Sequence, residues 1–312
     1  MFATLLKNNA SGTLPPEKAF PKCHTEPPAH VWPTPDGFTL PFIKSLPDAL
    51  PPKGVLLTFP GLDGVTGDYA SITNELPKHG YAVYGTENRT SVYGALGSQG
   101  DERNWVNWIN DLRGFHQYVS KIHPGVPVFW HGHSFGAVTA MAALKDAPGD
   151  AMPAGLIVHS PGYSMMDISS WAGIVFGKVF GAARWPHLRY MDWKGMMMTT
   201  DEGFDRRWKH SEDRVKAGIK IRCLVEAIKM GEQARKVAGG LTMPVLAIWG
   251  GKDLVAINGF EKQRDEYNAF IRSELASGRA TQFFAEASAH VVTEDVDRDQ
   301  ALAATVGWLD GI

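Results

Sequence analysis

The stretch that decides the fold is VPVFWHGHSFGAVTAMAA, residues 126–143. It begins with a short apolar run, Val126 to Trp130, passes through the pentapeptide GHSFG at 132–136, and continues in small residues that tolerate a helix. This order predicts a strand, a very tight turn and a helix. In a G-x-S-x-G turn the glycines lack Cβ atoms where the chain reverses, so one serine is held exposed at a helix N-terminus. Ser134 is therefore the candidate nucleophile, and the alternative is a glycine-rich turn with an idle serine.

The bulk composition is typical of one large α/β domain with an insertion. The chain has 312 residues, of which 44% are hydrophobic and 11% aromatic, enough for a sizeable core. The formal net charge is −2 and no long basic run occurs, which argues against binding to nucleic acid or to an anionic membrane. Cys23 and Cys223 have no metal-type spacing, which argues against a disulfide framework and a zinc site. We expect no cofactor and no metal, and small neutral or amphiphilic molecules as partners.

The N-terminal region predicts an extended lead-in. Residues 1–36 are rich in proline, which excludes a long helix or a central strand and favours a segment that wraps the domain. The apolar patch near the start is too short for a secretory signal, and no run approaches the ~18 apolar residues of a spanning helix. We therefore expect a soluble, cytoplasmic protein. The sequence leaves open its oligomeric state and a transient contact of the cap described below with a lipid surface.

Apolar strand patterns alternate with helical patterns along most of the chain. Strands are predicted within 38–44, 55–59, 81–85, 126–130, 155–159, 244–249 and 282–285, and helices within 69–76, 104–122, 224–237, 259–277 and 296–309. This alternation predicts a mostly parallel, doubly wound sheet with ligands at the carboxyl ends of the strands, and the G-x-S-x-G turn on such a sheet is the pattern of an α/β-hydrolase fold. Asn104 or Asp101 is the predicted cap of the second helix.

The alternation fails between residues 163 and 221, where Met and aromatic residues mix with a charged segment. The interpretation is a single domain whose core is 37–162 and 222–312, with a helical cap at 163–221 inserted after a core strand. Soft Met and rigid aromatic side chains would give the cap an adaptable apolar wall over the site. Alternatively, each of these side chains belongs to the cap's own core.

Two residues near the C-terminus are candidates to activate the serine. A serine hydroxyl alone is a weak nucleophile and needs a base in hydrogen-bond reach and a carboxylate that orients the base. In α/β hydrolases the three follow in the order Ser, acid, His, on loops after strands. Asp253 follows the strand at 244–249, and His290 is the only one of the eleven histidines beyond it. We predict His290 as general base and Asp253 as the carboxylate that fixes its tautomer.

The loop after the strand at 55–59 reads PGLDG, residues 60–64. An α/β hydrolase places its second oxyanion donor in such a loop, because two N–H groups must face the charge that develops on the substrate carbonyl oxygen. The predicted donors are the amides of Leu62 and Phe135. For the first, the alternative is an ordinary strand-to-helix turn.

Five further residues compete for catalytic roles. His133 adjoins the nucleophile on a turn where neighbours point apart, which favours a packing or hydrogen-bonding role. Asp295 and Asp297 lie near a predicted helix N-terminus, where carboxylates commonly complement the helix dipole. His131 and His159 end buried strands and are placed to border the site.

Several motifs match one known family. They are the GHSFG elbow preceded by PGVPVFW, HSPG at 159–162, LTMPVLAIWGGKD at 241–253, AEASAH at 285–290 and the segment 213–237. On these motifs, most of residues 54–312 resembles the monoacylglycerol lipase and lysophospholipase branch of the serine α/β hydrolases. The resemblance implies Ser134, Asp253 and His290 as catalytic triad, with the Leu62 and Phe135 amides as oxyanion donors.

Two motifs depart from the family pattern. The oxyanion loop begins with Pro-Gly where members usually have His-Gly, and the loop ENRTSVYGALGSQG at 87–100 is longer than the usual D-x-x-G-x-G-x-S-x-G. The triad is unaffected by either change, whereas cap and loop sequences set the shape of the pocket.

These features predict a cofactor-free serine hydrolase of carboxylic esters with an apolar acyl chain. The resemblance implies monoacylglycerols or lysophospholipids as substrates and a place in lipid metabolism. Attack by Ser134 would give an acyl-enzyme that water, activated by His290, then cleaves. Amide or peptide hydrolysis and acyl transfer to an alcohol would use the same residues, and a non-catalytic ligand-binding protein on the same fold is a further alternative. Dehalogenase and epoxide hydrolase chemistry is disfavoured because it needs a carboxylate at position 134.

Overall fold

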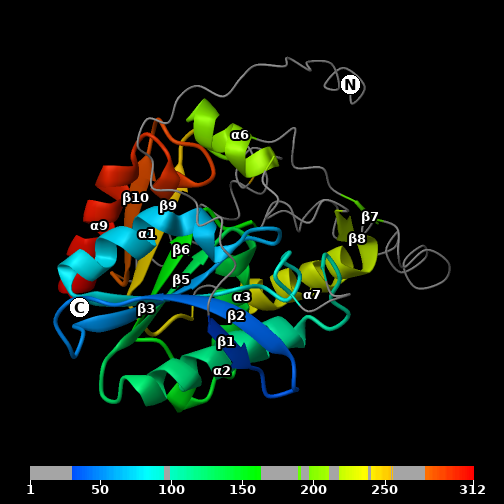
Figure 1. Cartoon of the computed structure of the whole chain (residues 1–312), viewed down its shortest axis with the longest axis horizontal. Helices are drawn as coiled ribbons and strands as arrows, with labels where there is room; N and C mark the ends of the chain where they lie inside the picture. Colours follow the sequence, from blue (N-terminus) through cyan, green and yellow to red (C-terminus); the bar gives the residue numbers. More distant parts are fainter. Residues whose placement is uncertain are drawn as a thin grey trace.

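A computed structural model describes residues 30–94, 99–162, 189–190, 197–210, 218–237, 240–253, 255 and 278–312. An eight-stranded sheet forms the centre of this part of the chain (Figure 1). Its strands, in spatial order, are β1 (His30–Pro33), β2 (Thr39–Ser45), β4 (Tyr81–Thr86), β3 (Gly54–Phe59), β5 (Val128–His133), β6 (Gly155–His159), β9 (Val245–Gly250) and β10 (Ala280–Ala285). The pairs β1–β2 and β2–β4 are antiparallel, and the remaining pairs are parallel. The predicted mostly parallel α/β sheet is confirmed.

The central strands are buried along their whole length. Every residue of β3, β4, β5, β6 and β9 is buried. Strands covered on both faces read as continuous apolar runs rather than as an alternating pattern, which is why these segments stand out in the sequence. The short strand β1 was not expected within the proline-rich lead-in. It pairs at the edge of the sheet and ends at Pro33, where the missing N–H of proline costs little.

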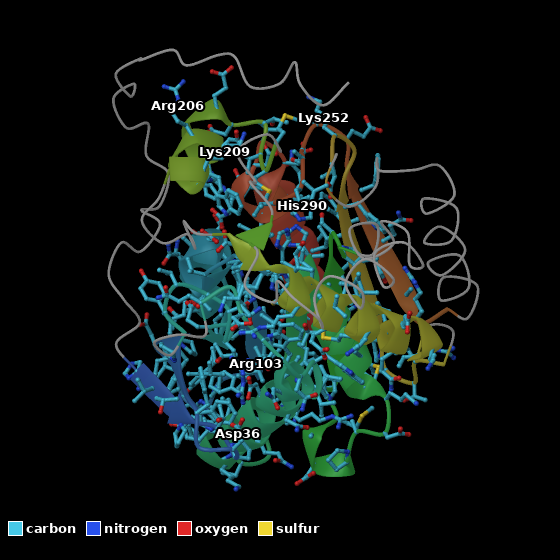
Figure 2. All side chains as sticks on the ribbon, turned by 90° about the vertical axis from the view of Figure 1, so that its right-hand side faces the viewer. Asp36, Arg103, Arg206, Lys209, Lys252 and His290 are labelled. Atoms are coloured by element: carbon cyan, nitrogen blue, oxygen red, sulfur yellow. The ribbon has the colours of Figure 1, made fainter. Side chains whose placement is uncertain are left out.

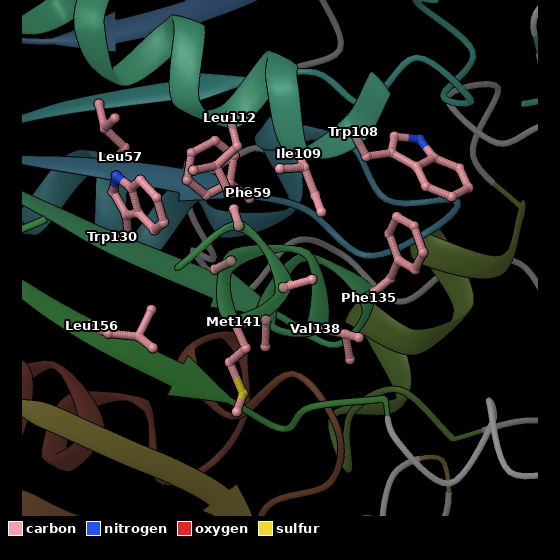
Figure 3. Close-up of a cluster of buried hydrophobic side chains, with 14 of the residues drawn as sticks. Leu57, Phe59, Trp108, Ile109, Leu112, Trp130, Phe135, Val138, Met141 and Leu156 are labelled. Atoms are coloured by element: carbon pink, nitrogen blue, oxygen red, sulfur yellow. The ribbon is translucent and has the colours of Figure 1, made fainter. Parts of the chain in front are cut away.

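Helices cover both faces of the sheet. On one face lie α2 (Val106–Ile122), α3 (Phe135–Leu144) and α7 (Ile221–Val237), and on the other lie α1 (Ala70–Glu75) and α9 (Arg298–Asp310) (Figure 1). The first face holds the cluster drawn in Figure 3, in which Trp108 and Leu112 of α2 and Met141 of α3 meet Trp130 and Leu156 of the sheet. This packing fixes α3, and with it the turn between β5 and α3, against the sheet.

The short elements complete the described structure. They are η1 (Thr66–Tyr69), η2 (Leu76–His79), η3 (Gly149–Ala151), η6 (Val292–Glu294), α6 (Glu202–His210) and the antiparallel pair β7 (Arg189–Tyr190) and β8 (Ile219–Lys220). The N-cap of α2 is Trp105, one residue after the predicted cap Asn104. The side chain of Asn104 still serves the start of the helix, because its Oδ1 accepts the N–H of Val106 at 3.2 Å. Among the described residues, no helix combines the length and the apolar character needed to cross a membrane.

Some predictions fall on other parts of the chain. The predicted helix at 259–277 and most of the predicted cap lie outside the described residues, as does most of the lead-in. Within the cap range, the structure describes 189–190, 197–210 and 218–221. The second of these, called here the 197–210 segment, contains α6, which lies above the sheet in the view of Figure 1.

Candidate active site

The turn between β5 and α3 holds Ser134 in a strained conformation. Ser134 is the N-cap of α3, with φ +53° and ψ −116°, a region that costs of order 1–3 kcal/mol and persists only where the surroundings impose it. A Cβ at Gly132 would lie 2.5 Å from the Cα of Ala137, and one at Gly136 would lie 2.2 Å from the carbonyl oxygen of Phe59. Both glycines are therefore required sterically, and the predicted strand, tight turn and helix are present.

Asp253 and His290 form a buried pair. Asp253 follows β9 and His290 follows β10, and these parallel neighbours bring the two loops together. The Nδ1 of His290 lies 2.8 Å from Oδ2 of Asp253, with side chains 1% and 0% exposed. Oδ1 of the same carboxylate accepts the N–H of Val255 at 2.8 Å. Because the carboxylate accepts from Nδ1–H, the Nε2 lone pair of His290 is left to take a proton.

A glycine lets the two loops come this close. A Cβ at Gly250, the last residue of β9, would lie 1.9 Å from the carbonyl oxygen of Ala289. No side chain fits there, so the residue before His290 rests directly on the end of β9. Figure 2 shows His290 in the interior of the molecule, below Arg206 and Lys209 of α6.

One pocket collects three of the five predicted site residues. Its lining comprises Gly61, Leu62, Asp63, Gly64, Asp68, Tyr69, His133, Ser134, Met198, Trp208, His290 and Val291. Ser134, His290 and Leu62 therefore border the same space, while Asp253 lies behind the histidine. Met198 and Trp208 belong to the predicted cap, whose Met and aromatic side chains were expected to form an apolar wall over the site. Tyr69 was not expected at the pocket, since its sequence context is only that of a helix start.

Phe135 contributes its backbone at the same place. It is the first residue of α3, so its N–H has no partner within the helix. A Cβ built on Gly162 would lie 3.3 Å from Oγ of Ser134 and 3.5 Å from the nitrogen of Phe135, so these two groups face one small space. The ring of Phe135 packs edge-on against Trp108, 4.8 Å between centroids, which anchors the residue on its other side.

His133 joins three loops of the site. The N–H of Gly61 donates to the Tyr69 hydroxyl at 3.1 Å, Oη of Tyr69 lies 2.7 Å from Nδ1 of His133, and Nε2 of His133 lies 3.0 Å from the carbonyl oxygen of His290. A carbonyl only accepts, so His133 carries its proton on Nε2 and the hydroxyl donates to Nδ1. Burial, with His290 nearby, holds the pKa of His133 well below its usual value, which keeps the ring neutral. His133 thus makes the hydrogen bonds that its sequence position predicts.

His131 and His159 lie outside the pocket lining. Nε2 of His159 accepts the N–H of Val292 at 3.2 Å, and its Nδ1 faces Nε2 of His131 at 3.3 Å. Burial lowers the pKa of His131 to about 3 and that of His159 well below its usual value. Both rings are therefore neutral parts of the core beneath the site.

Asp295 and Asp297 lie at the N-terminus of α9, as predicted, and their carboxylates bind the histidine loop. Asp297 Oδ2 accepts the N–H of Ala287 at 2.9 Å and the hydroxyl of Ser288 at 3.0 Å. Asp295 Oδ2 accepts the N–H of Ala289 at 2.7 Å. Asp297 is the N-cap of α9 but makes no side-chain cap bond there. The predicted place at a helix N-terminus is therefore correct, and the structure adds the hydrogen bonds to the histidine loop.

The described residues contain no cluster of three or more His, Cys, Asp or Glu side chains suited to a metal ion. The pocket brings together the hydroxyl of Ser134, the imidazole of His290 paired with a carboxylate, and the unpaired first N–H of α3. Such a set can transfer an acyl group through the serine.

Comparison with known proteins identifies relatives. The Hydrolase_4 family, described as serine aminopeptidase, S33, matches residues 50–288. No curated protein sequence matches the chain. Similar solved structures include a soluble variant of the Saccharomyces cerevisiae monoglyceride lipase in complex with a substrate analog (TM-score 0.75, 18% identity, 94% of this chain and 98% of that one). Another is the monoacylglycerol lipase of Paleococcus ferrophilus (TM-score 0.69, 18% identity, 86% of this chain and 98% of that one). A third is a highly thermostable carboxyl esterase of Bacillus coagulans in complex with glycerol (TM-score 0.67, 18% identity, 91% of this chain and 97% of that one). At these identities the likeness establishes the shared fold.

Proposed function

The chain belongs to the Hydrolase_4 (serine aminopeptidase, S33) family, and from this premise we propose that it hydrolyses carboxylic esters with an apolar acyl chain, through an acyl-enzyme on Ser134. The observation that carries the proposal is the Asp253–His290 pair, whose histidine borders the same pocket as Ser134. A buried carboxylate that holds an imidazole beside a serine is the arrangement that activates a hydroxyl for attack on a carbonyl.

The proposed steps use the serine hydroxyl, the imidazole and two backbone N–H groups. Nε2 of His290 takes the proton of the Ser134 hydroxyl as Oγ attacks the ester carbonyl, and the N–H groups of Leu62 and Phe135 donate to the oxyanion. One such donor is worth ~10²–10³ in rate. The tetrahedral intermediate then expels the alcohol, which receives the proton from His290. Water, deprotonated by the same nitrogen, attacks the acyl-enzyme and releases the acid.

The pocket lining supports a monoacylglycerol as the substrate. Met198, Trp208 and Val291 give an apolar wall suited to an acyl chain. Asp63 and Asp68 border the same pocket, and carboxylates accept hydrogen bonds from the free hydroxyls of a glycerol ester.

A second candidate is removal of an N-terminal residue from a peptide. The description of the family names an aminopeptidase, which favours this candidate. The acyl-enzyme chemistry would be the same. An aminoacyl p-nitroanilide therefore belongs in the substrate panel.

The test replaces Ser134 with Ala and compares it with Ser160→Ala. Ser160 is a fully buried serine outside the pocket lining, so its variant controls for the loss of a buried hydroxyl. We expect Ser134→Ala to abolish turnover of p-nitrophenyl butyrate and 1-monooleoylglycerol and labelling by a fluorophosphonate, while Ser160→Ala retains all three. Undiminished turnover by folded Ser134→Ala would exclude the mechanism. Faster turnover of the anilide than of every ester would favour the peptidase.

A further inference from the structure

Asp295 joins the histidine loop to the 197–210 segment. The residue is 3% exposed. Oδ2 accepts the N–H of Ala289 at 2.7 Å and the N–H of Thr200 at 2.8 Å. Oδ1 accepts the hydroxyl of Thr200 at 2.5 Å and the N–H of Val296 at 2.8 Å. One buried carboxylate thus holds two segments that lie far apart in the sequence, and we call the contacts between Asp295 and Thr200 the latch.

A backbone hydrogen bond reinforces the latch on the other side of the histidine. The N–H of Val291 donates to the carbonyl oxygen of Met198 at 2.8 Å. The amides on both sides of His290, those of Ala289 and Val291, therefore depend on partners that touch or belong to the 197–210 segment. The position of the catalytic imidazole is tied to the position of this segment.

The 197–210 segment behaves as one unit because hydrogen bonds within it join the residues before α6 to α6 itself. The N–H of Met198 donates to Oδ1 of Asp205 at 2.8 Å, and the N–H of Phe204 donates to Oδ1 of Asp201 at 2.6 Å. Phe204 also packs in one core cluster with Met198 and Trp208, the two side chains that line the pocket. Moving this unit would therefore move part of the pocket wall as well as the latch.

We propose that Asp295 is a positioning residue that couples the seating of the 197–210 segment over the pocket to the placement of His290. The inference rests on the proposed esterase function. When the segment is seated, Thr200 completes the hydrogen bonds of Asp295, and the carboxylate holds the histidine loop. When the segment lifts, Asp295 loses both hydrogen bonds from Thr200 and keeps those from Ala289 and Val296, and the N–H of Val291 loses the carbonyl oxygen of Met198. The pocket wall and the active histidine are therefore assembled in one step, which keeps the serine unreactive in an open pocket.

Two substitutions break the latch differently. Both oxygens of Asp295 accept a backbone N–H, so in Asp295→Asn the amide NH₂ must face at least one donor in either orientation. Thr200→Val removes only the hydroxyl bond. The matched control is Thr199→Val, since the Thr199 hydroxyl donates to the carbonyl of Asp201 within the same segment.

The first measurement is kcat for p-nitrophenyl acetate, whose acyl group is too short to need the apolar wall. We expect kcat to fall ~100-fold for Asp295→Asn, because a misplacement of about 1 Å costs this much. For Thr200→Val, which loses one hydrogen bond, we expect a smaller fall of ~10-fold. Thr200→Ser should restore kcat, and Thr199→Val should keep it. The double variant should be no slower than Asp295→Asn alone, since both changes break one contact. Unchanged kcat in both latch variants, or strictly additive effects, would overturn the proposal.

The second measurement follows the coupling without relying on turnover. Hydrogen exchange of the peptide that contains Ala289 and Val291 should speed up in Thr200→Val but not in Thr199→Val. Equal exchange in wild type and Thr200→Val would overturn the coupling. Absence of esterase activity in the wild type, with the exchange effect present, would contradict the proposed function and leave the coupling between the segments standing.

Discussion

Replacement of Asp253 with Asn tests the proton path of the proposed reaction. In the structure Oδ1 accepts the N–H of Val255 and Oδ2 accepts Nδ1–H of His290, each at 2.8 Å. An Asn side chain offers one oxygen, and if that oxygen stays with Val255, its NH₂ group faces Nδ1. The imidazole must then carry its proton on Nε2, where it cannot take the proton of Ser134.

The surroundings of Asp253 favour this unproductive orientation. Turning the amide over would oppose its NH₂ to the N–H of Val255 and leave a buried donor unsatisfied, at a cost of ~1–3 kcal/mol. That cost makes the productive tautomer ~5- to 150-fold rarer, since about 1.4 kcal/mol is a factor of ten. The neutral amide also fails to stabilise the imidazolium that forms during attack. Together we expect kcat to fall by ~10³–10⁴, equivalent to about 4–5.5 kcal/mol of barrier.

The assay is kcat for p-nitrophenyl butyrate, with Asp297→Asn as control. Asp297 accepts hydrogen bonds from Ala287 and Ser288 on the histidine loop but does not touch the imidazole, so its variant controls for loss of a carboxylate in this region. Circular dichroism verifies that both variants fold. A folded Asp253→Asn enzyme that keeps more than about a tenth of the wild-type kcat would refute the reasoning.

Two further predictions concern stability. Gly136→Ala should lower the free energy of unfolding by about 3 kcal/mol, because its Cβ would lie 2.2 Å from the carbonyl oxygen of Phe59. Gly307→Ala has open space around it in α9 and should raise the free energy of unfolding by about 0.5–1 kcal/mol. Equal stability of the two variants in urea unfolding would contradict this prediction. Burial raises the pKa of Glu294 from 4.5 to about 8, so the stability it contributes is full below pH 4.5 and is lost as pH rises through 8. Glu294→Gln mimics the protonated form and can keep both hydrogen bonds to Ser71. The Tm of this variant minus the Tm of the wild type should therefore increase from pH 5 to pH 9. A Tm difference that does not change with pH would contradict the prediction.

Local features of the chain predicted the sheet and its main turn. The buried strands are readable because continuous apolar runs bounded by glycine and proline have few other structures available. The elbow at 132–136 is readable because only glycine fits where α3 approaches β3, as the 2.2 Å contact at Gly136 shows. The pair Asp253 and His290 could be chosen from the sequence because parallel strands end at one edge of the sheet, which brings their loops together.

Local reasoning failed where a partner lay far away along the chain. Asp295 and Asp297 have the sequence context of a helix N-terminus, yet their carboxylates bind loop amides, and Asp295 also binds Thr200, 95 residues earlier. Tyr69 is the N-cap of α1, as its sequence context predicts, but nothing in that context shows that its hydroxyl contacts His133, 64 residues later.

The sequence by itself determined the order of strands and helices, the strained serine turn and the chemical identities of the three candidate catalytic groups. These depend on periodicity, on glycine sterics and on the fixed direction of parallel strands, all of which are local or follow from chain order. Only the tertiary structure decided which side chains hold those groups in place, with Tyr69, Thr200 and Asp295 as its main additions. A buried hydrogen bond forms between any donor and acceptor that packing brings within about 3 Å of each other. This distance cannot be inferred from how far apart two residues lie in the sequence.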